Sequence, residues 1–461
     1  MKPLTTGYIR KIICGKLVHG TDNLLIQHGA YRLKQVRQPN TILFLQRKII
    51  KWERLKPYFP LAIVTDRELT INEQSENLTV IKVDDLQESY WKFINNYRSS
   101  FNIPVIAVTG TSGKTTTKEM IRHLLSVNWK VAYTNSTNNS RTAHLTYLLA
   151  IDEATDVAVF ETAVGAPGDI SKAAAYLKPT IGIITNIGEH HLNYCKSLEG
   201  YIAAKGEMRD ALQPDGVLII NIDDQNTRKL DLTDFSGTII TIGIHSNCDY
   251  RASDIDYSTE GMYMTVEHRQ KKYRILVPGI GEHQVYNGLA AIAAVHHLGM
   301  SLADIAVHFR TFKPLNKQLQ KVIGVNGSTV IDDTWSITTT SLRAALKVLE
   351  RIGENQKKIA VIGTITDLGS WGYTIHEMAG DIIAESNIHV LLTIGKHAKI
   401  MADTVSNKGA PIEVHSFNNH ILAFELLKKI TTEDSVVLIK GDMFSEAIKK
   451  LATLLRKTEK D

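Results

Sequence analysis

The stretch Pro104-Val-Ile-Ala-Val-Thr-Gly-Thr-Ser-Gly-Lys-Thr-Thr-Thr117 decides how the centre of this chain folds. The apolar run from Val105 to Val108 predicts a buried strand, a glycine turn follows, and a helical pattern begins near Lys114. A turn between a strand and a helix N-terminus offers backbone N–H groups and a helix dipole to phosphate. We therefore predict a nucleotide-binding loop formed by Gly110, Thr111, Ser112, Gly113, Lys114, Thr115 and Thr116.

Two side chains of this loop have predicted roles. Lys114 is expected to act as a point charge against the outer phosphates, and the Thr115 hydroxyl to reach a magnesium ion. The general pattern Gly-x-x-x-x-Gly-Lys-Ser/Thr has a glycine five residues before Gly113, whereas this chain has Val108 there. An ordinary glycine turn is the alternative, but Gly-Lys-Thr-Thr directly after a β-branched strand favours phosphate binding.

Length and composition bound the class of protein. A chain of 461 residues is too long for one compact core, so about two to four domains are expected. The 43% hydrophobic and 22% charged content is typical of a soluble globular protein. A net charge of +5 gives no sign of a nucleic-acid partner, and we predict none. The chain has no run of about eighteen apolar residues, so we predict no membrane insertion.

Cysteine usage indicates the compartment. The three cysteines, Cys14, Cys195 and Cys248, are far apart and have no metal-like spacing. This usage fits a reducing environment and excludes a disulfide framework, so we predict a cytoplasmic protein.

The order of apolar runs predicts an α/β fold with three units in series. Residues 1–100 contain short strand-like runs and end in an amphipathic helix, and residues 101–313 alternate strands with helices. Phe312-Lys313-Pro314 marks the next boundary because proline closes the preceding helix. Residues 314–461 form a third alternation. The predicted strands are 41–45, 61–65, 78–83, 156–161, 180–185, 216–220, 328–332, 358–362, 390–394 and 435–440, and the predicted helices include 86–97, 169–177, 198–211 and 282–298.

Polar side chains follow successive strands of the middle unit. Glu161 ends one strand, Asn186-Ile-Gly-Glu-His-His191 follows the next, and Lys205 lies with Glu207 on the helix after that. Ligands gather at the carboxyl ends of parallel strands. Taken singly, each could be a solvated surface residue. Together, beside nucleotide phosphates, they could hold a second divalent ion.

These motifs resemble those of the Mur ligases, the ATP-dependent amide-forming enzymes of peptidoglycan precursor synthesis. The resemblance covers roughly residues 101–461, and residues 1–100 match only in outline. It rests on Thr109 to Thr117, Glu161, Thr185 to His191, Ala204 to Glu207, Gly281 to His283, Asn287 to Ala291, Ile331 to Asp333, Gly363 to Gly369, His376, Gly380 and Lys440-Gly441. It implies a small N-terminal substrate domain, a central P-loop NTPase-like domain with a parallel sheet, and a C-terminal Rossmann-like domain.

The resemblance also implies a mechanism. ATP would phosphorylate a carboxylate, and an amine would then displace phosphate from the acyl phosphate, a reaction that depends on positioning and charge neutralisation. Lys114, Glu161, His191 and Lys205 would be catalytic. Thr115 and Glu161 would hold one Mg²⁺, and His191 and a carbamylated Lys205 would hold a second.

The resemblance also implies further contacts to the nucleotide and to the substrate. His283 and Asn287 would face the nucleotide, and Asp332 would approach it from the third domain. Asn138 and Asn139 would contact the substrate.

The chain departs from the family pattern at several positions. Trp335-Ser-Ile-Thr-Thr339 stands where the family usually has Tyr-Asn-Ala-Asn-Pro. Lys317 is the cation nearest to the place where an arginine usually reaches the γ-phosphate across the domain gap. After Asn138 and Asn139, Thr142 and His144 replace the usual glycine and proline. The Asp-Ser-Arg segment that grips the uridine nucleotide has no clear counterpart in residues 1–100.

Three functions are compatible with this pattern. The motifs are most similar to those of the member that adds D-alanyl-D-alanine to a UDP-muramoyl tripeptide. A Mur-type ligase for another carboxylate, such as a secondary-metabolite or poly-amino-acid precursor, is the first alternative. A nucleotide-binding homologue without turnover is the second. In each case we predict a monomer that binds small molecules.

Overall fold

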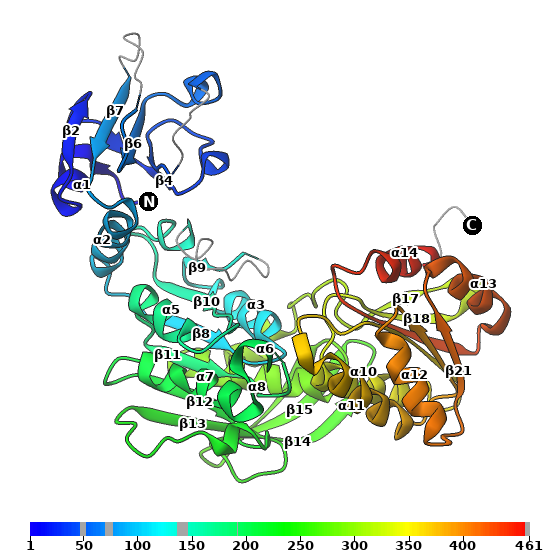
Figure 1. Ribbon diagram of the computed structural model, residues 1–461. Helices are drawn as coiled ribbons and strands as arrows, with labels where there is room; N and C mark the ends of the chain where they lie inside the picture. The colour runs from blue at the N-terminus through cyan, green and yellow to red at the C-terminus, as the bar shows by residue number, and fades with distance from the viewer. Residues whose placement is uncertain (47–51, 70–76, 136–145, 191, 457–461) are drawn as a thin grey trace.

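The computed structural model describes residues 1–46, 52–69, 77–135, 146–190 and 192–456. Its strands form three main sheets in chain order, each covered by helices (Figure 1). The predicted three-part α/β architecture is therefore confirmed. The boundaries at residues 100/101 and 313/314 stay predictions, and we use them below only to name an N-terminal, a middle and a C-terminal unit.

The N-terminal unit contains a five-stranded sheet with the order β2-β7-β6-β5-β4 and a separate pair, β1-β3. Its elements are β1 (Leu4–Thr5), α1 (Thr6–Ile12), β2 (Lys16–His19), β3 (Leu25–Ile26), β4 (His28–Ala30), β5 (Thr41–Phe44), β6 (Leu61–Thr65), β7 (Leu78–Lys82) and α2 (Leu86–Ser99), with short 3₁₀ turns at Leu33–Gln35, Trp52–Arg54 and Lys56–Tyr58. Helix α2 joins this unit to the middle unit: Trp91 stacks on Tyr176 and Arg98 donates to the Leu177 carbonyl. Figure 1 shows the unit standing apart from the C-terminal unit.

The middle unit is built on a nine-stranded sheet with the order β16-β15-β14-β13-β12-β11-β8-β10-β9. Strands β8 to β13 pair in parallel in the order β13-β12-β11-β8-β10-β9. Strands β14, β15 and β16 form an antiparallel meander at one edge of the sheet. Its elements are β8 (Val105–Thr109), α3 (Lys114–Leu125), β9 (Val131–Tyr133), β10 (Val157–Glu161), α5 (Asp169–Leu177), β11 (Ile181–Ile184), α6 (Leu192–Cys195), α7 (Leu198–Ala211), β12 (Val217–Asn221), a 3₁₀ turn (Thr227–Lys229), β13 (Thr238–Gly243), β14 (Tyr250–Tyr257), β15 (Gly261–His268), β16 (Lys271–Pro278), α8 (Glu282–His297) and α9 (Leu302–Phe309).

The C-terminal unit has a six-stranded sheet with the order β17-β18-β22-β19-β20-β21, parallel except for β17. Its elements are β17 (Gln320–Ile323), a 3₁₀ turn (Val325–Gly327), β18 (Thr329–Asp333), α10 (Thr339–Ile352), β19 (Lys357–Gly363), a 3₁₀ turn (Gly369–Trp371), α11 (Gly372–Ala384), β20 (Val390–Ile394), α12 (Ala398–Asn407), β21 (Glu413–Phe417), α13 (His420–Ile430), β22 (Ser435–Lys440) and α14 (Glu446–Leu455). Parallel strands with helices between them match the predicted Rossmann-like unit.

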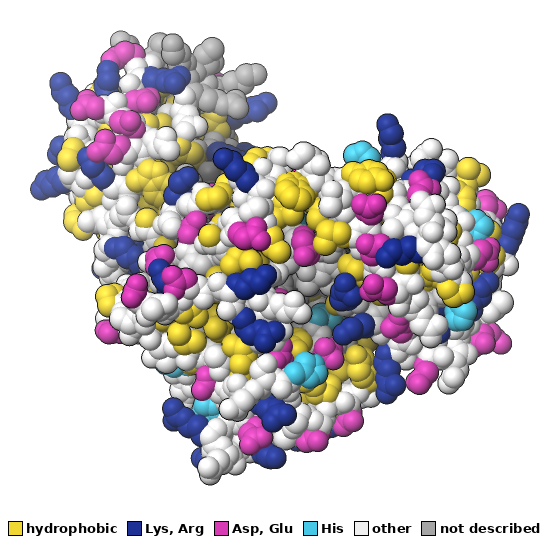
Figure 2. Space-filling model, turned by 60° about the horizontal axis from the view of Figure 1, so that its bottom comes forward, with side chains coloured by type: hydrophobic (Ala, Val, Ile, Leu, Met, Phe, Trp, Pro, Cys, Tyr) yellow, Lys and Arg dark blue, Asp and Glu magenta, His cyan; other side chains and the backbone are white. Residues whose placement is uncertain are grey.

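Apolar packing fixes the middle and C-terminal units against each other. One continuous buried cluster includes Ile187 and Leu192 of the middle unit together with Leu342 and Leu368 of the C-terminal unit. The carboxyl ends of β8, β10 and β11 therefore face the C-terminal unit across a shared boundary. Within the described residues, no helix is both long and apolar enough to cross a membrane. Figure 2 shows positive and negative side chains interspersed over one face, in keeping with the small net charge.

Candidate active site

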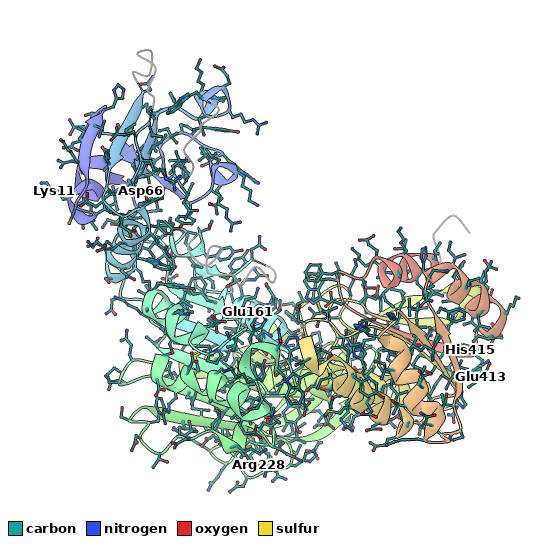
Figure 3. All side chains as sticks on the ribbon, in the orientation of Figure 1. Lys11, Asp66, Glu161, Arg228, Glu413 and His415 are labelled. Carbon is teal, nitrogen blue, oxygen red and sulfur yellow. The ribbon has the colours of Figure 1, made fainter. Side chains whose placement is uncertain are left out.

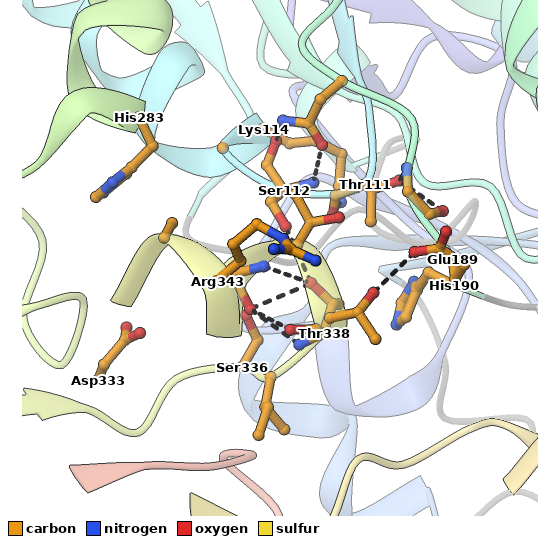
Figure 4. A pocket seen from close by; sticks show the side chains of 18 of the residues that line it. Thr111, Ser112, Lys114, Glu189, His190, His283, Asp333, Ser336, Thr338 and Arg343 are labelled. Carbon is orange, nitrogen blue, oxygen red and sulfur yellow. Dashed lines mark hydrogen bonds between the residues drawn. The ribbon is translucent and has the colours of Figure 1, made fainter. Parts of the chain in front are cut away.

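A cleft of about 1010 Å³ lies where the middle and C-terminal units meet. One wall comes from the loop after β8, the end of β10, the loop after β11 and the start of α8. The other wall comes from the segment after β18, from α10 and α11, and from the end of β22. Its size and mixed lining suit a nucleotide together with a second substrate. Figure 4 shows several of the lining side chains.

The loop after β8 has the geometry of a phosphate cradle. Gly110 and Gly113 have φ values of 144° and 81°, which disfavour L side chains. A Cβ on Gly113 would lie 2.2 Å from the Asn287 Oδ1 atom, and one on Gly110 would lie 1.9 Å from the Thr185 Oγ1 atom. Val108, where the general pattern has glycine, is instead a buried residue of β8. The turn is thus made by the two glycines that this chain retains.

The loop after β11 holds the cradle in place. The Asn186 side chain accepts a hydrogen bond from the Ser112 N–H at 3.0 Å and donates to the Ser112 carbonyl at 3.0 Å. The Gly188 N–H donates to the Thr111 hydroxyl at 2.8 Å. These bonds arise because parallel strands β8 and β11 are neighbours, so the loops after them share one sheet edge.

Lys114 is the first residue of α3 and points back over the loop, where its Nζ donates to the Thr111 carbonyl at 3.0 Å. Burial lowers the pKa of Lys114, and the nearby Glu161 carboxylate opposes that shift. Burial disfavours the charged ammonium, and an anion beside it would favour that form. This arrangement suits a phosphate-binding lysine.

Thr115 and Glu161 form an oxygen pair at the carboxyl end of the sheet. The Thr115 hydroxyl donates to the Glu161 carboxylate at 2.8 Å, and the Glu161 side chain is almost fully buried. Figure 3 places Glu161 in the upper part of the middle unit, near α3. A hydroxyl and a carboxylate beside phosphates fit the oxygen ligands that Mg²⁺ prefers. The described residues contain no group of three or more His, Cys, Asp and Glu arranged for a metal.

Glu161→Gln tests this pair. We expect the Mg²⁺ concentration needed for half-maximal activity to rise about 10- to 100-fold, because a charged oxygen ligand is lost. A magnesium titration of phosphate release measures the change. Glu354→Gln, at an exposed ion pair with Arg351, is the control. An unaltered magnesium requirement in Glu161→Gln would contradict the assignment.

Lys205, on α7, lies close to this pair but is enclosed. Its side chain is 1% exposed and is absent from the cleft lining. Its Nζ donates to the Thr109 hydroxyl at 3.2 Å and lies 5.0 Å from the centre of the Tyr201 ring. Burial, reinforced by the positive charge of Lys114, lowers the pKa of Lys205 well below its usual value. Both effects disfavour the charged ammonium form of this side chain. Glu207, two residues further on, instead accepts hydrogen bonds from the Gly168 and Ser171 N–H groups at the start of α5.

Helix α8 brings His283 and Asn287 to the cleft, one turn apart. Burial, with the nearby charge of Lys440, lowers the pKa of His283 to about 4, so its imidazole is neutral at neutral pH. The Asn287 Oδ1 accepts from the Thr117 hydroxyl at 3.4 Å, directly behind Gly113. Both side chains can therefore offer hydrogen bonds to a bound nucleotide.

Two residues predicted to reach the nucleotide from the C-terminal unit lie elsewhere. Asp332 is buried, forms an ion pair with Arg456 and is absent from the cleft lining. Lys317 is exposed and is also absent from that lining. The neighbouring Asp333 lines the cleft instead, paired with the buried Lys440. Burial raises the pKa of Asp333, and the Lys440 charge counteracts this shift.

The altered segment after β18 makes direct contacts with the middle unit. The Thr338 and Ser112 hydroxyls lie 3.3 Å apart, and the Thr339 hydroxyl donates to Glu189 at 2.9 Å. Thr116 donates to Gln318 at 2.9 Å across the same boundary. Thr338 also caps α10 by accepting from the Ser341 N–H. The hydroxyl-rich sequence thus lines the cleft and links the two units.

Three residues of the predicted site, His191, Asn138 and Asn139, lie outside the described residues. His190, next to His191, lines the cleft.

The sequence patterns did not indicate two of the residues that line the cleft. Arg343 on α10 reads as an ordinary exposed helix residue, and Asp223 follows a predicted strand but belongs to no motif. Burial by itself raises the pKa of Asp223. Hydrogen bonds from Ser246, His245, Ile244 and Tyr286 outweigh this effect and lower the pKa to about 2.

Comparisons with known proteins agree with this geometry. The family description "Mur ligase middle domain" matches residues 108–295, and "Mur ligase, glutamate ligase domain" matches residues 319–443. The UDP-N-acetylmuramoyl-tripeptide–D-alanyl-D-alanine ligase of Bacillus subtilis is 29% identical over 393 residues, which cover 85% of this chain and 84% of the relative. The enzyme of the same name from Buchnera aphidicola subsp. Baizongia pistaciae is 30% identical, with coverages of 76% and 75%.

Solved structures share the fold over nearly the whole chain. MurF from Acinetobacter baumannii gives a TM-score of 0.86 at 23% identity and covers 98% of this chain and 99% of its own. MurF ligase from Thermotoga maritima, solved in complex with ADP, gives a TM-score of 0.77 at 19% identity, with coverages of 93% and 96%. The chain therefore belongs to the Mur ligase family, the ATP-dependent, ADP-forming ligases that join a carboxylate to an amine.

Proposed function

We propose that this chain joins D-alanyl-D-alanine to the terminal carboxylate of a UDP-N-acetylmuramoyl tripeptide at the expense of ATP. The names of curated relatives that match most of the chain support this substrate pair. The single observation that carries the chemistry is the cleft, where the phosphate cradle of one unit faces Asp333, Lys440 and α10 of the other. We also propose the domain boundaries 100/101 and 313/314, a monomeric state and a cytoplasmic location.

The reaction would have two steps, both carried out by residues of the cleft. The loop N–H groups and Lys114 would hold the γ-phosphate while a substrate carboxylate oxygen attacks it and ADP leaves with the bridging oxygen. The amine would then attack the acyl carbon, and inorganic phosphate would leave from the tetrahedral intermediate. Mg²⁺ at Thr115 and Glu161 would neutralise charge on the phosphates.

The second ion site is part of the proposal. His191 and a carbamate on Lys205 would supply its ligands, because a carbamate turns a buried neutral amine into an oxygen donor. The lowered pKa and burial of Lys205 support this modification. Asn138 and Asn139 would contact the sugar-peptide substrate.

A phosphate-release screen with ATP and magnesium tests the substrate assignment. UDP-N-acetylmuramoyl tripeptide with D-alanyl-D-alanine is compared with other carboxylates and amino acids. We expect release that depends on both components of the muramoyl pair, with the amide product seen by mass spectrometry. Release only with another pair would assign the chain to a different carboxylate. Release with none of the pairs would favour a nucleotide-binding homologue without turnover.

A further inference from the structure

Arg343 brings a positive charge from the C-terminal unit to the cleft. Its side chain is 57% exposed and forms an ion pair with Glu385 at 3.9 Å, a partner that is itself 67% exposed. Exposed ion pairs of this length hold a guanidinium only weakly. Lys440, on the same wall, differs because it is 1% exposed, pairs with Asp333 and donates to the Ser336 carbonyl at 3.2 Å. Arg343 is therefore the more available of these two cations for an anionic ligand.

The start of α10, on which Arg343 lies, contacts the loop that holds the phosphate cradle. Residues three and four positions apart share a helix face, and long side chains lean toward the helix N-terminus. Thr339, four residues before Arg343, bonds to Glu189. Thr340, three residues before it, has its hydroxyl 2.0 Å from the place of a Cβ on Gly188. Arg343 thus lies one turn along α10 from the contact with the loop that holds the cradle, and it lines the same cleft as Ser112 and Thr338 (Figure 4).

We propose that Arg343 contacts the γ-phosphate of ATP bound on the loop 110–116 and stabilises the charge that develops during phosphoryl transfer. In that step the bond from the γ-phosphorus to the bridging oxygen breaks, a bond to the substrate carboxylate oxygen forms, and ADP keeps the electron pair. A guanidinium fork matches two phosphate oxygens, which an ammonium cannot do. Arg343 would supply the cross-domain cation that Lys317, exposed and outside the cleft lining, does not supply.

This proposal rests on ligase chemistry at the cleft, so its first test avoids the carboxylate and the amine. Affinities for ATP and ADP, each with magnesium, are measured by displacement of a fluorescent nucleotide. The wild-type protein is expected to bind ATP more tightly than ADP. In Arg343→Ala the affinity for ATP should fall about tenfold, while the affinity for ADP is retained. Arg351→Ala, on the same helix and paired with the exposed Glu354, is the matched control. An ATP preference that survives in Arg343→Ala would overturn the proposal.

Turnover provides the second test. Arg343→Ala is expected to lower kcat about 10²- to 10³-fold, with a smaller change in the KM for ATP. Arg343→Lys should recover part of the loss, and guanidinium ions in solution should partly rescue Arg343→Ala. An increase confined to the KM for the dipeptide would show that Arg343 binds the dipeptide carboxylate, and would overturn the proposal. The proposal would also be overturned if Lys317→Ala lowered kcat and Arg343→Ala did not. A wild-type protein inactive with every substrate pair would refute the proposed function, while the ATP and ADP affinities would still decide the role of Arg343.

Discussion

Replacing Lys114 with alanine is expected to lower ATP-dependent phosphate release about 10³-fold, the scale of losing a main charge contact to a transferring phosphoryl group. Lys114 is held over the cradle by its bond to the Thr111 carbonyl, and burial already weakens its hydration. Its interaction with the phosphates therefore takes place where water screens little. The substitution removes that charge but leaves the loop N–H groups, Thr115 and Glu161 in place.

Steady-state phosphate release with the muramoyl substrates measures this loss. Lys130→Ala, at an exposed ion pair with Asp152, is the control for removal of a lysine and should keep its activity. A thermal melt of both variants checks that each is folded. Full activity in Lys114→Ala would remove the phosphate-cradle assignment altogether.

Much of the fold could be predicted because its buried elements carry strong local patterns. Strands β6, β20 and β22 and helices α5 and α7 have the predicted bounds. Each strand is a continuous apolar run between turn residues, as expected when both faces of a parallel sheet are covered. The meander β14 to β16 was not predicted. In β15 buried and partly exposed residues alternate, and such half-buried strands give a weaker signal than a continuous run.

The choice between Asp332 and Asp333 shows a limit of motif reading. Successive side chains of a strand point to opposite faces, so only one of the two can face the cleft. The sequence Ile331-Asp-Asp333 does not say which one. The structure decides it through partners distant in sequence: Arg456 pairs with Asp332, and Lys440 on the neighbouring strand β22 pairs with Asp333.

Arg343 illustrates a different limit. An arginine one turn into an amphipathic helix is common, and its local sequence indicates only a solvated face. Its importance comes from the packing of α10 against the loop after β11, a contact between residues about 150 positions apart in the chain. The motifs therefore pointed to the loops after β8 and β11 and to the start of α8 on the middle unit, but not to Asp223. The opposite half depends on how the two units meet.

Replacing Lys205 with alanine is expected to abolish amide formation while ATP still binds, because the cradle and the Thr115–Glu161 pair stay in place. A short-chain carboxylate such as formate, added in solution, should restore part of the activity by occupying the space that the proposed carbamate would fill. Intact-protein mass spectrometry in bicarbonate should show a gain of one CO₂ on the wild type and none on Lys205→Ala. Normal turnover by Lys205→Ala would show that the carbamate assignment is wrong.

The two lysine predictions are coupled through electrostatics, which gives the carbamate a sharper test. Only the neutral amine reacts with CO₂, and both burial and the Lys114 charge keep the pKa of Lys205 low. Removing the Lys114 charge in Lys114→Met should therefore raise the pKa of Lys205. Carbamate uptake should then require a higher pH than in the wild type, although Lys205 itself is unchanged. A carbamate that forms with the same pH dependence in both proteins would mean that burial alone keeps the amine neutral.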